Sequence, residues 1–251
     1  MDIPLVRISD MPSQELVVLI GGTNSLAKAL VKEYLSKKNL FKVIVTARDK
    51  NKFDDLYMDC LSEKLEFYEL DVLKLADMDG LVAYAEKHKR KVTFYYLAAV
   101  KNSGSNDIEN LFKINFLSSV HCHDVLLRRM ADFNFILVGS QGDIHGTEGT
   151  SSYNASKSAM SKYFEPIAIM NKDVKKVFMV KPWIFQSKMI QTSAVKRTLS
   201  CSVEYIARGI IKGVDKNNSL IFVPAFTYKL IEVLSFFNKK FLYIILFKFM
   251  K

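Results

Sequence analysis

Short apolar runs alternate with amphipathic segments along most of the chain. Seven short runs, most of them rich in Val, Ile, Leu and Phe, predict strands at 15–20, 41–46, 64–70, 92–99, 133–138, 174–180 and 219–223. Apolar positions at helical spacing predict helices at 25–35, 76–89, 108–130 and 203–214, with another that begins before Tyr153 and ends near 170. This alternation favours an α/β fold with a Rossmann-like, doubly wound and mainly parallel sheet. No linker-like stretch interrupts 15–224, so we predict a single domain over residues 1–224.

Residues 225–251 form a hydrophobic and basic tail. Its polar positions Glu232, Ser235, Lys239 and Tyr243 recur at helical spacing, which predicts an amphipathic helix with a broad apolar face. Its longest uncharged run, 241–247, is far shorter than the ~20 residues that span a bilayer. The surrounding lysines suit a helix lying on an anionic membrane surface. A helix that closes the substrate pocket or a subunit interface fits the same pattern, and the sequence leaves both open.

The formal net charge of the 251 residues is +10. The lysines are scattered rather than gathered on one element among aromatic residues, which argues against a nucleic-acid binder. Such scatter fits affinity for a phosphate-bearing cofactor, an anionic substrate or an anionic membrane. Three widely spaced cysteines without a C-x-x-C pair indicate reduced thiols, and the first eleven residues do not resemble a signal peptide. Both features favour a cytoplasmic protein, peripheral at the inner face of the membrane if the tail binds lipid.

Ser140, Tyr153 and Lys157 are the candidate catalytic residues. Lys157 follows Tyr153 by four positions, so both side chains share one face of a helix. A free phenol titrates near ~10, and a cation fixed beside it would lower that pKa toward the range useful at neutral pH. Ser140 ends an apolar run and could hydrogen-bond the same substrate oxygen. Together the three groups indicate a carbonyl-reducing site, although Tyr-x-x-x-Lys alone also occurs on solvated helix faces.

The first predicted strand ends in a glycine turn. Backbone N–H groups at the start of the following helix could hold a pyrophosphate there. The residues of this turn are Gly21, Gly22, Thr23, Asn24, Ser25 and Leu26. Thr23, Asn24 and Ser25 would add hydroxyl and amide donors, whereas Ser25 and Ala27 stand where a fuller fingerprint has glycine. An ordinary strand-to-helix turn explains the same residues equally well.

Two further strand ends are candidate cofactor contacts. A basic residue after the second strand suits the 2′-phosphate of NADP, and an acidic one suits the ribose hydroxyl of NAD. Arg48 therefore favours NADP(H) over NAD(H), with Asp49 as an opposing neighbour. Asp71 and Val72 follow the third strand, where Asp71 could bind the adenine amine, cap the next helix, or do both.

These motifs resemble those of the short-chain dehydrogenase/reductase family in its single-domain form, over about 17–224. The resemblance implies that Tyr153 is the acid and base, that Lys157 binds the nicotinamide ribose and tunes Tyr153, and that Ser140 binds the carbonyl oxygen. It also implies that Asn115, within the predicted helix 108–130, holds the water of a proton relay. A homodimer or homotetramer is the family expectation.

The same resemblance implies further cofactor contacts in two later segments. Ala98 and Ala99 are the expected adenosine contacts, in a segment that departs from the Asn-Asn-Ala-Gly of the family. Pro182, Ile184 and Ser187 are the expected nicotinamide contacts. Trp183 replaces the glycine that follows Pro182 in the family, which places a bulky side chain near the nicotinamide.

The sequence therefore predicts NADPH-dependent reduction of a ketone to a secondary alcohol, on a small-molecule or lipid-linked substrate. Within the family, the motifs most resemble a group that includes the keto-reductase partner of decaprenylphosphoryl-ribose epimerisation. This implies a keto-sugar of cell-surface glycan biosynthesis. One alternative is a non-catalytic NADP(H)-binding regulator or scaffold, and another is an extended-type epimerase or dehydratase. No metal site is predicted, because His121 and His123 at i, i+2 face different sides of a helix.

Overall fold

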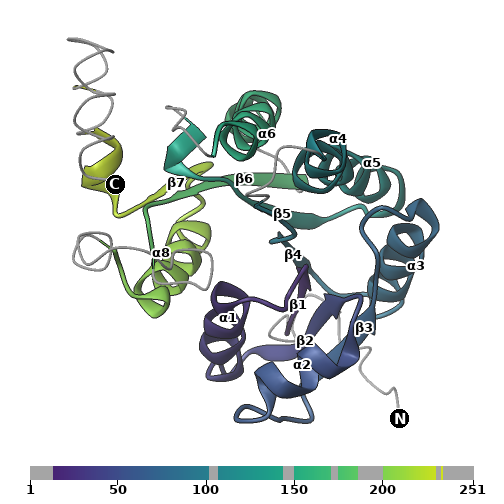
Figure 1. The fold of residues 1–251 in the computed structure, drawn as a ribbon. Helices are drawn as coiled ribbons and strands as arrows, with labels where there is room; N and C mark the ends of the chain where they lie inside the picture. The colour runs from purple at the N-terminus through teal and green to yellow at the C-terminus, as the bar shows by residue number, and fades with distance from the viewer. Residues whose placement is uncertain are drawn as a thin grey trace, which may run out of the picture.

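The computed structural model describes residues 14–101, 107–143, 150–170, 175–185, 200–229 and 233. Within these ranges the strands form one parallel sheet in the order β3-β2-β1-β4-β5-β6-β7 (Figure 1). The strands are β1 (Glu15–Ile20), β2 (Leu40–Ala47), β3 (Leu65–Glu69), β4 (Val92–Tyr96), β5 (Phe133–Val138), β6 (Lys175–Pro182) and β7 (Leu220–Val223). The predicted doubly wound fold in a single domain is confirmed.

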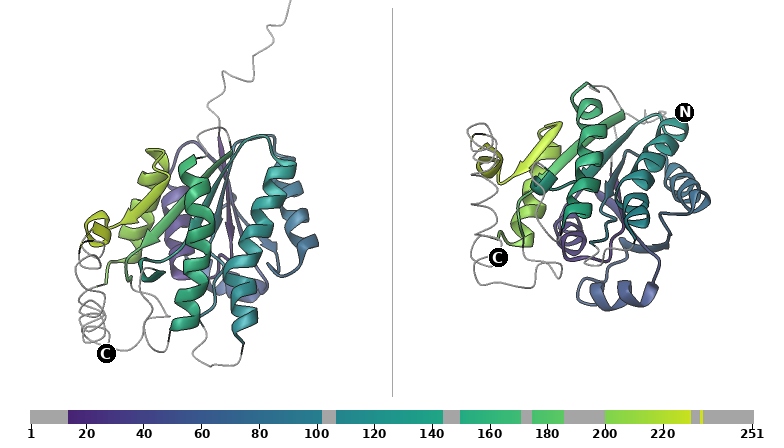
Figure 2. Two further views of the ribbon diagram at one scale, coloured as in Figure 1. Left: turned by 90° about the horizontal axis from the view of Figure 1, so that it is seen from above. Right: turned by 45° about the horizontal axis from the view of Figure 1, so that its top comes forward.

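Helices cover both faces of the sheet (Figure 2). One face carries α1 (Ser25–Leu35), α2 (Lys50–Tyr57) and α8 (Val203–Asp215). The other carries α3 (Leu75–Glu86), α4 (Ile108–Phe112), α5 (Ser118–Arg129) and α6 (Ser151–Met170). Because helices cover both faces, the central strands are buried on both sides, and β1, β4 and β5 are almost continuous apolar runs rather than alternating ones.

The predicted helix at 108–130 is interrupted in the structure. The π-helical turn η2 (Lys113–Leu117) separates α4 from α5. The hydroxyl groups of Tyr96 and Ser118 both donate to the backbone oxygen of Ile114, at 3.0 and 2.7 Å. One long-range and one local hydroxyl thus bind the backbone at the interruption. A π-turn inside an α-helix is often found at a functional site.

Helix α2 is an element that the hydrophobic pattern does not predict. It is short, and only Phe53 and Tyr57 are buried on its inner face. Asp49 begins it by accepting hydrogen bonds from the backbone N–H groups of Asn51 and Lys52, at 3.0 and 3.3 Å. Strand β4 also ends earlier than predicted, at Tyr96 rather than at residue 99.

The chain crosses from one half of the sheet to the other between β1 and β4. In sheets of this order, ligands bind where the carboxyl ends of the strands separate at that crossing. Residues 225–229 begin a helix, but most of the predicted tail at 225–251 lies outside the described residues. In the described ranges, no helix is both long and apolar enough to cross a membrane.

Candidate active site

Ser140 lies immediately beyond the carboxyl end of β5. The backbone N–H of Gly139 still donates to the oxygen of Val180 on β6, at 2.8 Å, so the sheet extends to the residue before Ser140. A 3₁₀ turn, η3 (Gln141–Asp143), follows, and the backbone N–H of Asp143 donates to the oxygen of Ser140 at 3.2 Å. Ser140 is therefore held between the end of a buried strand and a tight turn.

Lys157 extends from α6 to the same strand end. Its ammonium group donates to the backbone oxygen of Val138 at 2.9 Å, and the residue is 3% exposed. Burial disfavours the charged form and lowers the pKa of Lys157 to about 8, although the carboxylate of Asp143 opposes this shift. The lysine predicted from the i, i+4 spacing is thus fixed within two residues of Ser140.

Tyr153 lies one helical turn before Lys157 on α6 and is partly exposed. We predicted that Lys157 would lower the pKa of Tyr153. In the structure, burial raises the pKa of Tyr153 to about 12, and the Lys157 ammonium interacts with Val138 instead. The predicted direction is wrong because burial penalises the charged phenolate and is the cause of the shift. Tyr153 is therefore a neutral phenol at physiological pH.

Asn115 lies in the π-turn and joins three segments. Its amide oxygen accepts from the backbone N–H of Val100 at 2.8 Å, and its amide nitrogen donates to the oxygen of Val100 at 3.0 Å. The amide nitrogen also donates to the hydroxyl of Ser156, at 3.0 Å, and that hydroxyl donates to the backbone oxygen of Tyr153. The Asn115 side chain thus fastens the loop after β4 to the turn of α6 that carries Tyr153. Its role in a water relay remains a prediction.

The turn after β1 requires both of its glycines. Gly21 has a φ of +79°, and a Cβ atom there would lie 2.5 Å from the Cα atom of Ala98. A Cβ atom at Gly22 would lie 2.3 Å from a methyl carbon of Val45. The close approach of Gly21 and Ala98 occurs where β1 and β4 end side by side, at the crossing of the sheet. This is the geometry that lets a ligand reach the backbone.

Asn24 and Leu26 have structural roles at the start of α1. The Asn24 side chain caps the helix by accepting from the N–H of Ala27 at 3.0 Å, and its amide donates to the oxygen of Gly21 at 2.8 Å. The amide that we predicted as a cofactor donor is thus used within the turn. Leu26 is 3% exposed and packs into the core, which leaves its backbone for any cofactor contact.

Thr23 and Ser25 remain suited to a phosphate. Both are partly exposed, and their hydroxyl groups form no hydrogen bond with the described part of the chain. They flank the N-cap of an eleven-residue helix, whose N-terminus favours anions. With the close backbone approach at Gly21, these features fit a dinucleotide.

Arg48 and Asp49 lie at the end of β2 and have different environments. Arg48 is exposed and forms no ion pair with the residues that the structure describes. Asp49 is occupied as the N-cap of α2, and its carboxylate also lies 3.6 Å from the ammonium of Lys52. The acidic neighbour that opposed NADP(H) in the sequence is therefore already paired, which leaves Arg48 available to an anion.

Asp71 does not cap the following helix. The N-cap of α3 is Lys74, whereas Asp71 accepts from the N–H of Leu73 at 3.1 Å in a local turn. The predicted capping role is wrong, because three residues separate Asp71 from the helix start. Asp71 and Val72 are both partly buried beyond β3. The adenine contact of Asp71 and the cofactor contact of Val72 stay predictions.

The segment after β6 is described only to residue 185. Pro182 ends the strand, and the backbone N–H of Trp183 donates to the oxygen of Val223 at 2.8 Å. The oxygen of Ile184 accepts from the N–H of Cys201 at 3.0 Å. Ser187 lies outside the described residues. The nicotinamide contacts of Pro182, Ile184 and Ser187 stay predictions.

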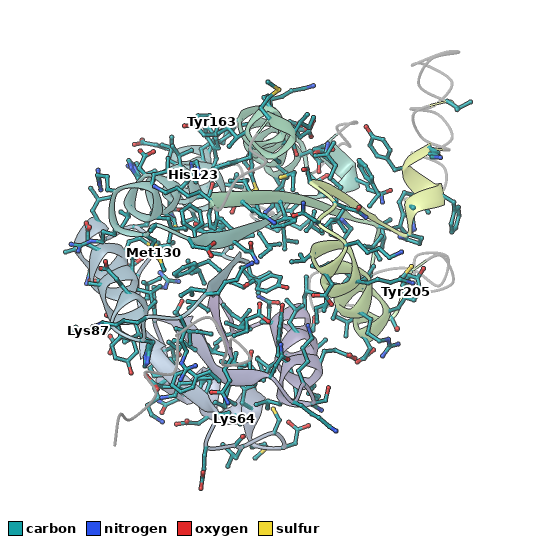
Figure 3. The ribbon with its side chains drawn as sticks, turned by 180° about the vertical axis from the view of Figure 1, so that it is seen from behind. Lys64, Lys87, His123, Met130, Tyr163 and Tyr205 are labelled. Carbon is teal, nitrogen blue, oxygen red and sulfur yellow. The ribbon has the colours of Figure 1, made fainter. Side chains whose placement is uncertain are left out.

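The two helical histidines face different sides, as predicted. His121 is exposed, whereas His123 (labelled in Figure 3) is buried. The His123 ring stacks on Phe135 at a centroid distance of 5.9 Å and meets Phe133 and Phe164 edge-on. Across the described ranges, no group of three His, Cys, Asp or Glu side chains could hold a metal ion.

A family model for short chain dehydrogenases matches residues 15–197. The chain belongs to the short-chain dehydrogenase/reductase family. It is accordingly an NAD(P)-dependent oxidoreductase of that family. A search of curated protein sequences finds no match.

Solved structures of family members share the fold. A short-chain dehydrogenase from Streptomyces avermitilis is 20% identical, with a TM-score of 0.72 over 89% of this chain and 94% of that one. One from Burkholderia cenocepacia in complex with NADP is 14% identical, with a TM-score of 0.74 over 92% and 96%. One from Burkholderia phymatum in complex with NAD is 15% identical, with a TM-score of 0.71 over 88% and 93%. At these identities, the likeness shows the fold alone.

Sequence reasoning missed two charged residues beside this family site. Lys181 and Asp143 are buried, and the Lys181 ammonium lies 3.0 Å from a carboxylate oxygen of Asp143. A sequence signal did exist, since Lys181 is the one charged residue in the buried run 177–182, and Asp143 follows Ser140 by three positions.

Proposed function

We propose that this family member reduces a ketone to a secondary alcohol with NADPH. The observation that carries the proposal is the arrangement around the end of β5. A partly exposed neutral phenol, Tyr153, lies one helical turn from Lys157, whose ammonium is fixed beside the strand end that carries Ser140. A neutral phenol can give a proton to an oxygen that is becoming an alkoxide, and the reduction of a carbonyl group requires such a proton donor.

The residues would share the chemistry as follows. A bound nicotinamide dinucleotide would supply the hydride that adds to the carbonyl carbon. Tyr153 would transfer its phenolic proton to the carbonyl oxygen and recover a proton from solvent afterwards. Ser140 would donate a hydrogen bond to the same oxygen and stabilise its developing charge. Lys157 would bind the ribose, and its positive charge would favour the transient phenolate of Tyr153.

Arg48 supports a preference for NADP(H). It is exposed at the end of β2 and unpaired within the described residues, while Asp49 is engaged at the N-cap of α2. Among similar structures, one from Burkholderia cenocepacia is in complex with NADP and one from Burkholderia phymatum with NAD, so the fold accommodates either. Arg48→Gln should weaken NADPH binding about tenfold, since it removes a charged hydrogen bond, and should leave NADH binding unchanged. Equal weakening for NADH would contradict this role.

A keto-sugar is the proposed substrate class. It rests on the resemblance of the motifs and on the formal charge of +10, which suits a phosphate-bearing or lipid-linked substrate. A cytoplasmic location, a homodimer or homotetramer, and a peripheral membrane contact through 225–251 belong to the same proposal. Flotation of the full chain with anionic liposomes, compared with a chain ending at Tyr228, tests the membrane contact.

The activity is tested by NADPH oxidation with a panel of nucleotide-linked and lipid-linked keto-sugars and simpler ketones. Tyr153→Phe should lower kcat by about 10²-fold or more, since it removes the proton donor. Tyr163→Phe is the matched control, because Tyr163 lies on the same helix, is 40% exposed and contacts Phe116 and Phe164 only through its ring. Undiminished turnover in Tyr153→Phe would refute the mechanism.

The non-catalytic alternative has its own outcome in the same assay. Tight NADPH binding without turnover of any carbonyl in the panel would indicate a cofactor-binding regulator or scaffold. The extended-type epimerase or dehydratase would consume no NADPH in net turnover, so steady oxidation of NADPH in proportion to substrate excludes it.

A further inference from the structure

A cluster of charged side chains lies between β6, α6 and the turn that follows Ser140. The ammonium of Lys181, on β6, lies 3.0 Å from a carboxylate oxygen of Asp143 and also contacts the carboxylate of Glu165 on α6. The side chains of Lys181 and Asp143 are only 7% and 2% exposed. Burying charges costs free energy even when they are paired, so a cluster of this kind is weak as a source of stability. None of its three residues has a role in the proposed proton and hydride transfer.

Asp143 is anchored through both its backbone and its carboxylate. Its N–H donates to the oxygen of Ser140 at 3.2 Å, and its backbone oxygen accepts from the hydroxyl of Ser158 at 2.6 Å. Its carboxylate accepts from the hydroxyl of Ser161. Ser161 follows Lys157 by four positions on α6, so the carboxylate lies on the side of the helix from which Lys157 extends.

Gln141 ties the same turn to β6 and to the chain beyond β7. Its side-chain amide donates to the backbone oxygen of Lys181 at 3.1 Å, and its amide oxygen accepts from the hydroxyl of Thr227 at 2.9 Å. The turn that follows Ser140 is thus fixed on two sides. Asp143 therefore has little freedom to leave this side of α6.

The charged groups near Lys157 come from three elements. Asp143 lies on η3, Lys181 on β6 and Glu165 on α6, and the phenol of Tyr153 lies one turn away. Burial lowers the pKa of Lys157, and among the described residues Asp143 is the charged group that raises it. Burial raises the pKa of Asp143 itself, although Lys181 and Ser161 oppose that shift. Glu165 contacts Lys181 and also raises the pKa of Asp143, whereas it is not among the groups that shift the pKa of Lys157.

We propose that Asp143 is a positioning residue that acts through Lys157: anchored to α6 and β6, its carboxylate keeps the Lys157 ammonium charged, while the backbone oxygen of Val138 holds that ammonium. Lys181 holds that carboxylate ionised and oriented. The inference rests on the proposed function in one respect: in that function Lys157 must be positively charged to bind the cofactor ribose and to favour the phenolate of Tyr153. Tyr153 and the cofactor ribose would then meet a cation over the physiological pH range.

The test is a titration of Lys157 in the full-length protein. Lysine labelled with ¹³C at the ε-carbon is followed by NMR against pH, and Lys157 is the signal that disappears in Lys157→Arg. It is distinct because its pKa is about 8, while exposed lysines titrate near ~10.4. In Asp143→Asn the midpoint should fall by about half a pH unit or more, because the carboxylate that opposes burial is gone.

Glu165→Gln is the matched control, since it makes the same chemical change in the same cluster. It should leave the Lys157 midpoint unmoved, because Glu165 contacts Lys181 and not Lys157. Asp143→Asn keeps Lys181 paired with Glu165, and the double variant Asp143→Asn/Lys181→Met removes both members of the buried pair, which avoids an unpaired ammonium. Circular dichroism establishes that each variant is folded. An unchanged Lys157 midpoint in folded Asp143→Asn or in the double variant would overturn the proposal.

The titration needs no substrate, so it separates this inference from the proposed function. NADPH binding measured at pH 7 and at pH 9 adds the second comparison. One outcome is that the Lys157 midpoint falls in Asp143→Asn while the affinity for NADPH is the same at pH 7 and at pH 9. In that case Asp143 acts as inferred, and the proposed role of Lys157 in binding the cofactor is wrong. If the midpoint does not fall, the inference fails whatever the cofactor does.

Discussion

Gly21→Ala tests the backbone geometry on which the cofactor end depends. The substitution demands a φ of +79° from alanine, and the left-handed region costs an L-residue about 1–2 kcal/mol. The new Cβ atom would also lie 2.5 Å from the Cα and 2.6 Å from the N atom of Ala98. Those backbone atoms follow β4, which is paired along its length with β1, so they cannot move aside freely. Such overpacking costs about 1–3 kcal/mol more.

We therefore expect Gly21→Ala to lower the free energy of unfolding by about 2–5 kcal/mol. Urea denaturation followed by circular dichroism measures this as a lower midpoint with an unchanged slope. NADPH binding, measured by quenching of protein fluorescence below the unfolding transition, should be lost as well, since the displaced backbone borders the predicted phosphate turn.

Gly80→Ala is the matched control for this experiment. Gly80 lies within α3, and a Cβ atom there would lie 3.2 Å from the hydroxyl of Tyr68, the far end of a flexible side chain. Alanine is favoured over glycine in a helix by about 1 kcal/mol, which offsets the small shift required of Tyr68, so the stability of this variant should stay close to that of the parent. A loss below about 1 kcal/mol in Gly21→Ala would refute the close approach of Gly21 and Ala98.

Two further predictions concern the free energy of unfolding, measured by urea denaturation. Asn24→Ala should lower it by about 1 kcal/mol, because the substitution removes the side chain that caps α1. Asn24→Asp should retain most of the stability, and equal losses in both variants would contradict the capping role. Burial lowers the pKa of His123, so the folded state holds it neutral while the unfolded state takes up a proton near ~6.5. The contribution of His123 to the free energy of unfolding should be complete above that pH and fall as the pH drops through it. In urea titrations at pH 7.5 and 5.5, His123→Phe should lose this difference in stability between the two pH values. An unaltered difference would show that other groups cause it.

Most of the fold could be predicted because its signals are local. Strands buried on both faces are continuous apolar runs, and the helices between them show regular spacing, so their alternation predicts a parallel sheet. Helix α2 was missed because it buries only Phe53 and Tyr57 and depends on the Asp49 cap. The π-turn was missed because contacts with Val100, Tyr96 and Ser156 accompany it, and these are distant in the sequence.

By itself, the sequence determined which chemistry the site can carry and where its parts lie along the chain. Ser140 at a strand end, and Tyr153 four residues before Lys157, are local patterns that periodicity places on defined elements. Only the tertiary structure decided the protonation of these groups, because a pKa depends on desolvation and on charges that spacing does not reveal. Burial raises the pKa of Tyr153 to about 12 and lowers the pKa of Lys157 to about 8. The buried Asp143–Lys181 pair joins residues thirty-eight positions apart, and the folding of β6 beside β5 brings them together.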